Sequence, residues 1–322
     1  MSRKLFFLLG AFLLVLLHPF EVSPITLKLN ESQFSQLLHS LEAEGCQACH
    51  NGTNIEGLGQ VKQYLNKYGY YPEGVELTDE FNDQMETALK KYQEYSHLKV
   101  TGTLDSSTVK EMMIPRCGFP DIIYKNGTFG KNGNESTSHL VAHYAFAPTR
   151  WSVYKTHIVY TFSSSVQAVD MRTLRAAFSQ AFQRWAEVSH FTFEEARVVM
   201  IPDIVIGFHR LDHGDGYPFD GPGNTICHAF PPEDGRFHFD ADESWSTSPA
   251  ESEYDLESAA MHGIGHLLGL AHSQDLNAVM YRTLYPGTIK RDLTQDDIDG
   301  IRALYSNHQN TVTYVCNILG WF

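Results

Sequence analysis

Apolar residues recur every three or four positions along the first part of the chain, which is the period of an amphipathic helix. Within residues 26–115 one such stripe comprises Phe81, Met85, Leu89 and Tyr92. After a glycine turn, a further helix is predicted to start at Asp105 or Ser106. The pattern predicts a small helical unit over residues 26–115.

From His139 onward, strand and helix patterns follow one another. Residues 156–162 and 196–209 are rich in β-branched side chains and predict strands. A long amphipathic helix is predicted over residues 171–189, with an apolar stripe of Leu174, Phe178, Ala181, Phe182, Trp185 and Val188. Two more helices are predicted, one from about Leu256 and one over residues 294–305. Strands and helices without regular βαβ alternation predict an α+β fold.

Two stretches lack any period. Residues 122–138 are rich in Gly, Asn and Ser and are interpreted as an exposed linker. Residues 212–243, rich in Gly, Pro and Asp, are interpreted as one long loop without regular structure. Such a loop is uncommon inside a domain unless something holds it in place.

The N-terminus has the pattern of a secretory signal peptide. Arg3 and Lys4 precede an apolar run from Leu5 to Leu17, which is too short to cross a hydrocarbon layer of about 30 Å. No later segment is apolar over a membrane-spanning length, so we expect a soluble, secreted protein. Four N-x-[ST] sequons agree with secretion and predict glycosylation at Asn30, Asn51, Asn126 and Asn134.

The composition argues against one class of partner. The net charge of −14 disfavours nucleic-acid binding, which generally uses a basic face. A hydrophobic content of 43% supports a packed core. The surplus of acidic residues is explained either by solubility or by calcium binding.

The cysteine count is odd. The five cysteines are Cys46, Cys49, Cys117, Cys227 and Cys316, so a secreted chain could keep one thiol for a separate role and form two disulfides. Cys46–Cys49 with Cys227–Cys316 is one pairing among several. The segment from Cys46 to His50 also matches a c-type haem attachment motif, but its polar surroundings favour a local disulfide or a loop.

Three histidines have the spacing of a metal site. His262 and His266 are four residues apart, so on a helix both project from one face. Gly269 allows the chain to turn and bring His272 back to the same ion. Three imidazoles leave the fourth tetrahedral position open, which is typical of a catalytic zinc.

Two motifs carry a family resemblance. "HGIGHLLGLAH" followed by "AVMY" resembles the metzincin motif and its Met-turn. "PRCGFPD", residues 115–121 and called the switch segment below, resembles the cysteine switch of matrix metalloproteinases. Together, without a hemopexin-like tail, they resemble a plant-type matrix metalloproteinase zymogen of the matrixin family.

The resemblance implies a domain order. It comprises a signal peptide (1–23), a helical, peptidoglycan-binding-like pro-domain ending in the switch segment (24–121), a linker (122–138), a matrixin catalytic-type domain (139–308) and a short tail (309–322). It also implies an extracellular location in cell wall or matrix, a peptide or protein bound in the cleft, and a separate activating protease.

Cys117 has a role that its chemistry supports. A thiolate is a strong zinc ligand, and Cys117 could occupy the open zinc position and exclude water, although a structural disulfide is the alternative. The resemblance further implies that Arg116 pairs with Asp121 to hold the loop, and that Met280 lies beneath the zinc.

The stretch 212–243 carries a second set of ligands. His213, Asp215, His228 and His238 make a closed set of four, and the matching residues of matrixins bind a structural zinc. Hard oxygen ligands for at least one calcium are offered by Asp220, Gly221, Gly223, Thr225, Asp240 and Glu243. Arg236, standing where matrixins often have an aspartate, makes a second calcium site doubtful.

Position 263 departs from the family pattern. Zincins carry there a glutamate that moves protons for the zinc-bound water, whereas this chain has Gly263. Losing a general base costs about 10²–10⁴-fold in rate. Glu257 lies five residues before His262 and would face elsewhere on the helix. Arg282 and Leu284 replace two usual residues of the specificity pocket, so substrate preference is not carried over.

We therefore expect a zinc protein whose peptidase activity is strongly impaired or absent. One alternative is a competent endopeptidase that uses another base. The other is a non-catalytic module that binds peptides or cell walls.

Overall fold

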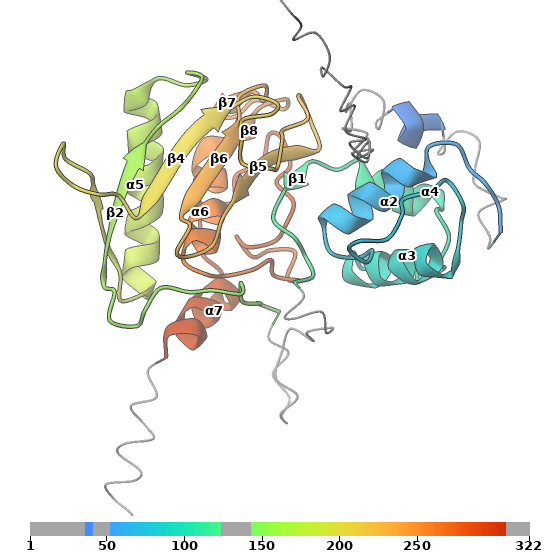
Figure 1. The fold of residues 1–322 in the computed structure, drawn as a ribbon. Coiled ribbons are helices and arrows are strands. Elements are labelled where there is room, and N and C mark those ends of the chain that lie inside the picture. Colours follow the sequence, from blue (N-terminus) through green and yellow to red (C-terminus); the bar gives the residue numbers. More distant parts are fainter. Residues whose placement is uncertain (1–35, 41–51, 124–142, 307–322) are drawn as a thin grey trace, which may run out of the picture.

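The computed structural model describes residues 36–40, 52–123 and 143–306. These residues form a smaller helical unit and a larger unit in which helices pack on a mixed sheet (Figure 1). The predicted α+β fold, with a helical domain first, is confirmed.

The helical unit follows a short helical stretch at residues 36–40. It comprises α2 (Leu58–Lys67), α3 (Asp83–Tyr95) and α4 (Ser106–Met112). Asn82 caps α3 by accepting the Met85 N–H, and Asp105 caps α4 by accepting the Thr108 N–H. The predicted start of α4 is thus confirmed, and the predicted apolar stripe of Phe81, Met85, Leu89 and Tyr92 is buried in the core of this unit.

A six-stranded sheet organises the larger unit, and its order is β1-β5-β6-β4-β2-β3. The strands are β1 (Arg116–Cys117), β2 (His157–Phe162), β3 (Thr192–Glu195), β4 (Ile204–His209), β5 (Thr225–Ala229) and β6 (Arg236–Asp240). Only β5 and β6 pair antiparallel, and the other neighbours are parallel. A small second sheet joins β7 (Trp245–Ser246) to β8 (Tyr254–Asp255).

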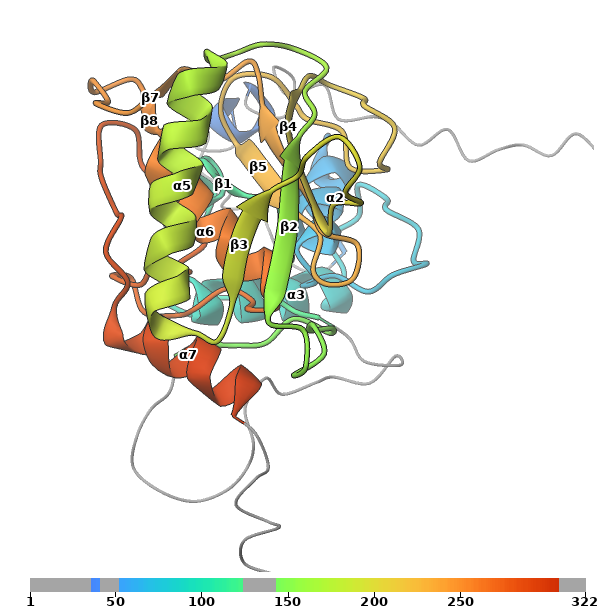
Figure 2. The same cartoon turned by 90° about the vertical axis from the view of Figure 1, so that its left-hand side faces the viewer.

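Three helices accompany this sheet: α5 (Met171–Val188), α6 (Leu256–Leu267) and α7 (Gln295–Tyr305). Figures 1 and 2 show α5 and α6 side by side against the sheet, with α7 at one end. The predicted stripe of α5 is buried except for Val188, which is half-buried. Its Trp185 donates its indole N–H to the Met261 carbonyl and so ties α5 to α6.

Two sequence predictions were wrong in part. The predicted strand over residues 196–209 is a strand only from Ile204, and the preceding loop exposes Val198, Val199 and Ile201. The interval 212–243 is not one irregular loop, since it contains β5 and β6. Both errors arise because burial on a sheet depends on distant neighbours, which β propensity does not encode. Among the described residues, no helix is long and apolar enough to cross a bilayer.

Candidate metal centres

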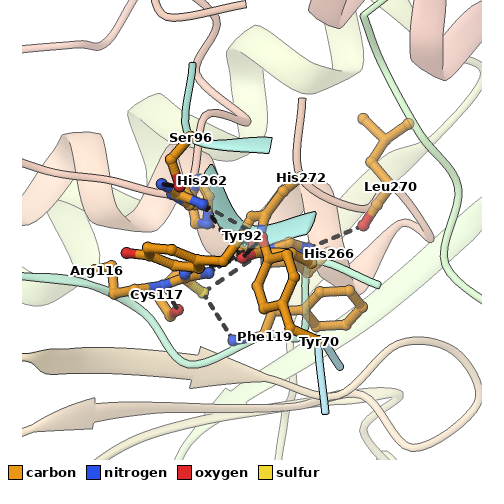
Figure 3. A network of polar contacts seen from close by, with 12 residues as sticks. Tyr70, Tyr92, Ser96, Arg116, Cys117, Phe119, His262, His266, Leu270 and His272 are labelled. Carbon is orange, nitrogen blue, oxygen red and sulfur yellow. Dashed lines mark hydrogen bonds and ion pairs between the residues drawn. The ribbon is translucent and has the colours of Figure 1, made fainter. Parts of the chain in front are cut away.

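Helix α6 and the turn after it position the three histidines. Asp255 caps the helix by accepting the Ser258 N–H, and His262 and His266 project from one face. Gly269 has a φ of 97°, in the left-handed region that favours glycine. The chain therefore reverses there and returns His272 to the other two rings (Figure 3).

The outer nitrogen of each ring is fixed by an acceptor. His262 Nδ1 lies 2.8 Å from the Val279 carbonyl, and His266 Nδ1 lies 2.9 Å from the Leu270 carbonyl. His272 Nδ1 lies 2.8 Å from Asp121 Oδ1. When each Nδ1 carries the proton and donates it, each Nε2 presents a lone pair to the space between the rings.

These inward lone pairs need a cation. The Nε2 atoms of His262 and His266 are 3.0 Å apart, and the buried His272 Nε2 has no hydrogen-bond partner. Unpaired buried acceptors that face one another are costly in a protein interior. The three residues therefore fit a metal ion, and burial lowers the pKa of His266 to about 4, which keeps it in the neutral form that ligands require.

Cys117 completes the cluster. Its Sγ is 3.6 Å from His266 Nε2, and the four ligand atoms lie within 4.8 Å of one another. A tetrahedral zinc would separate a thiolate sulfur and an imidazole nitrogen by about 3.5 Å. Burial alone would raise the pKa of the Cys117 thiol, but Cys227 and the nearby histidines lower it well below its ordinary value.

The switch segment lies as an extended strand between two parts of the larger unit. On one side, the Arg116 N–H donates to the Asn224 carbonyl over 2.6 Å and the Gly118 N–H to the Cys227 carbonyl over 2.7 Å. On the other side, the Cys117 N–H donates to the Arg282 carbonyl over 2.9 Å. Main-chain bonds therefore fix Cys117 over the histidines.

Asp121 joins the switch segment to the histidine site. Arg116 donates two hydrogen bonds to its carboxylate, of 2.6 and 2.9 Å, so the implied ion pair is present. Tyr70 also donates to it over 2.7 Å, and the other oxygen holds His272. Although burial opposes ionisation, the two guanidinium groups of Arg116 and Arg282, with His272, hold the pKa of Asp121 well below its usual range.

Arg282 lines a small cavity beside Cys117 and His262 and also reaches the helical unit. The side chain is buried and donates to Glu111 and Ser96 of the helical unit, each over 2.7 Å. Its guanidinium also lies over the rings of Tyr92 and Tyr95. Arg282 thus anchors the helical unit, and Leu284 borders the same cavity. No sequence signal indicated this anchor.

Gly263 is covered by a core aromatic side chain. A Cβ added at Gly263 would lie 2.0 Å from Cζ of Phe237, and Phe237 is fully buried on β6. Two residues on, a Cβ at Gly265 would lie 2.1 Å from the sulfur of Met280. Met280 therefore packs against the helical turn that carries both histidines.

A second cluster lies in the 212–243 interval. Asp215 Oδ2 is 2.8 Å from His213 Nε2, 2.7 Å from His228 Nε2 and 2.9 Å from His238 Nδ1. These four ligand atoms lie within 4.8 Å of one another. One oxygen facing three imidazole nitrogens is the donor set of a closed tetrahedral site, and burial lowers the pKa of His238 to about 3, which leaves it neutral.

The proposed calcium ligands come together only in part. Burial raises the pKa of Asp240 to about 7 and that of Glu243 to about 8, and Asp220 adds to both shifts. Asp240 Oδ2 is buried without a partner. Crowded carboxylates of this kind suit a hard cation. The Thr225 N–H donates to Asp220 over 3.3 Å, and the Thr225 hydroxyl accepts from Lys67 of the helical unit over 2.7 Å.

The nearby Gly221 and Gly223 contribute backbone groups to this acidic cluster. The Gly223 N–H donates to the Glu243 carboxylate over 2.5 Å, and Gly221 donates to Asp240. In this conformation it is their N–H groups, rather than their carbonyls, that approach the carboxylates.

Other sequence predictions have mixed outcomes. Glu257 faces away from the histidines, as expected, and pairs with Arg184 and Arg291. Cys227, offered as a partner for Cys316, is a buried free thiol. The remaining candidates lie outside the described residues: Cys46, Cys49, Cys316 and the sequons at Asn30, Asn51, Asn126 and Asn134.

Known proteins have sequences similar to this one. Metalloendoproteinase 1 of Glycine max is 45% identical over 265 residues, covering 80% of this chain and 84% of the relative. The matrixin family model matches residues 150–306, and a peptidoglycan binding domain model matches residues 55–112. The chain belongs to the matrixin family.

Other proteins are similar over much of the chain. Metalloendoproteinase 2-MMP of Arabidopsis thaliana is 39% identical over 281 residues, covering 81% of this chain and 74% of that protein. Interstitial collagenase of Sus scrofa is 36% identical over 284 residues, covering 86% of this chain and 55% of the collagenase. This matrixin thus has relatives named as metalloendoproteinases in plants and as a collagenase in an animal.

Proposed function

We propose that this matrixin is a secreted, glycosylated zymogen whose histidine site holds zinc and whose peptidase activity is strongly impaired or absent. A second zinc belongs to the cluster around Asp215, and calcium to the cluster of Asp240 and Glu243. The observation that carries the impairment is the Gly263–Phe237 contact, because the space for a general base is filled by a core ring.

Zinc at His262, His266 and His272 would supply a Lewis acid that polarises a carbonyl and lowers the pKa of bound water. The chain's own residues would orient the ligands, since each Nδ1 is held by an acceptor. Cys117 would fill the fourth position and exclude water until the pro-domain is removed by an activating protease.

Proton transfer is the missing part. Among the described residues, the four ligands of the histidine cluster are three imidazoles and one thiol. The neighbouring carboxylate of Asp121 is held by Arg116 and Tyr70 and contacts the outer nitrogen of His272. The carboxylate of Glu257 is engaged by two arginines. Without a group to take and return a proton, hydrolysis should be slower by about 10²–10⁴-fold.

The main-chain contacts of the switch segment favour a second function, the binding of extended peptides without cleavage. The switch segment forms backbone hydrogen bonds with β5 on one side and residues 282–283 on the other. This is the main-chain recognition used when a peptide adds a strand to a sheet edge. A peptide ligand could occupy the same place once the switch segment leaves.

The test compares three proteins in a Cys117→Ser background, after cleavage within residues 122–138 by an added protease. They are the parent, Gly263→Glu, and Gly263→Glu with Phe237→Ala. We expect peptide hydrolysis to rise by about 10²–10⁴-fold only in the double variant, because Phe237 blocks the glutamate in the single one.

Zinc content and circular dichroism of each variant provide the control for folding. A parent protein that hydrolyses peptides as fast as the double variant would show that another base is at work. Peptide binding by the parent without cleavage would support the second function.

A further inference from the structure

Cys117 and Cys227 are paired across two neighbouring strands. In the parallel pairing of β1 with β5, Cys117 is the register partner of Cys227. Adjacent strands lie about 4.8 Å apart, within the range of about 4.4–6.8 Å that separates the Cα atoms of a disulfide. The strand geometry therefore meets the first requirement for a cross-link.

The two side chains also border one space. Both cysteines are buried free thiols. A small cavity lined by Cys117, Cys227 and His262 adjoins the pair. This cavity, of about 10 Å³, puts both thiols on the edge of the same small space.

We propose that Cys117 and Cys227 form a redox-controlled disulfide, with a hydroperoxide as the oxidant, that locks the switch segment covalently onto β5. One thiol is first oxidised to a sulfenic acid as the peroxide O–O bond breaks and one water leaves. The second thiol then attacks that sulfur, the S–S bond forms and a second water leaves. Two thiols and one peroxide thus give one disulfide and two waters.

The cross-link gives the switch a second inhibited state. In the reduced state Cys117 faces the histidines, and the segment is held by non-covalent contacts. In the oxidised state the sulfur is lost as a thiolate ligand, but cutting the chain between residues 123 and 143 no longer frees the helical unit. This consequence rests on the proposed zymogen function, whereas the disulfide itself does not.

The test starts from the full chain, which is reduced and then separated from the reductant. The protein is treated with one equivalent of hydrogen peroxide, its remaining thiols are alkylated, and it is digested with trypsin in the absence of reductant. Trypsin cuts after Arg116, Lys125, Arg210 and Arg236. We expect a species in which the peptide 117–125 is joined to the peptide 211–236 by a disulfide. Dithiothreitol should separate it into the two peptides. Recovery of Cys117 mainly alkylated, or joined to a different cysteine, overturns the proposal.

A matched variant and a metal arm sharpen this test. Cys227→Ser keeps the switch thiol and should give only alkylated Cys117, with an unchanged unfolding midpoint showing that it folds. Added zinc should slow disulfide formation severalfold relative to chelator-treated protein, because the Cys117 sulfur cannot bind zinc and bond to Cys227 at the same time.

A second readout follows the protein after proteolysis between residues 123 and 143. The helical unit should stay attached to oxidised protein on non-reducing gels and leave after reduction. Detection of the cross-linked peptide by its mass requires neither bound zinc nor any peptidase activity of this protein. A missing cross-link would therefore leave the proposed function standing, and a competent peptidase would leave the cross-link standing.

Discussion

The ring of Phe237 occupies the space into which any side chain at position 263 would project, and its Cζ lies 2.0 Å from the place that a Cβ on Gly263 would take. The ring is fully buried and packs on Phe178 and Phe239. It cannot swing aside without disturbing the sheet core. A larger side chain at position 263 therefore requires a smaller one at position 237.

Gly263→Ala should destabilise the protein, although alanine in a helix is usually better than glycine by about 1 kcal/mol. Overpacking against Phe237 should outweigh this gain and lower the free energy of unfolding by about 1–3 kcal/mol. Urea denaturation measures it. Adding Phe237→Ala should make the alanine at 263 favourable again, and a stabilising Gly263→Ala alone would contradict the contact.

Arg282→Ala should loosen the switch segment. Removing one partner of a buried ion pair costs about 3–5 kcal/mol, and here Glu111 loses its arginine while Asp121 keeps Arg116 and loses its second one. We expect Cys117 to react with a thiol reagent faster by on the order of a hundredfold or more, since 1.4 kcal/mol is tenfold. Arg302→Ala, at an exposed position of α7, is the control and should leave the rate unchanged.

The metal content should follow the two histidine clusters separately. The parent should bind two zinc ions, and His272→Ala and His238→Ala should each lose one, because each removes a ligand from a different set of four. Elemental analysis of the folded protein measures this. The control variant His143→Ala, at an exposed position, should keep both ions. An unchanged zinc count in His272→Ala or His238→Ala would show that the cluster concerned does not bind zinc.

Calcium should stabilise the protein more strongly as the pH rises. Burial raises the pKa of Asp240 to about 7 and of Glu243 to about 8, above their unfolded values. Between roughly pH 4 and 8 the calcium-free folded state thus holds more protons than the unfolded chain, and its stability falls with rising pH. A cation that replaces those protons reverses this loss.

Thermal unfolding with calcium and with a chelator checks this dependence. The difference in Tm should be larger at about pH 8.5 than at about pH 5.5. Asp240→Asn should remove most of the difference, and a calcium effect that is equal at both pH values would count against this site.

The sequence predicts the histidine cluster well because its geometry is local. One helix fixes His262 and His266, and one glycine turn fixes His272, so spacing alone suffices. The ligand set around Asp215 was found by residue type, although β5 and β6, which carry two of its histidines, were not recognised as strands.

The remaining features depend on register between distant segments. The contact of Phe237 with Gly263 requires β6 to lie under α6, and the approach of Cys117 to Cys227 requires β1 to pair with β5 at one register. A shift of one residue would point each side chain to the opposite face. Local periodicity carries no information on such alignments, and the role of Arg282 was missed for the same reason.

Asp121 has a consequence for how the metal and the helical unit depend on each other. It belongs to the switch segment, yet it supplies the acceptor that orients His272. Loss of such an outer partner typically weakens metal affinity by about 10–100-fold. By thermodynamic reciprocity, an ion that binds more tightly with the segment in place must also hold the segment more tightly. Maturation and metal loss are therefore coupled, and whichever happens first makes the other easier.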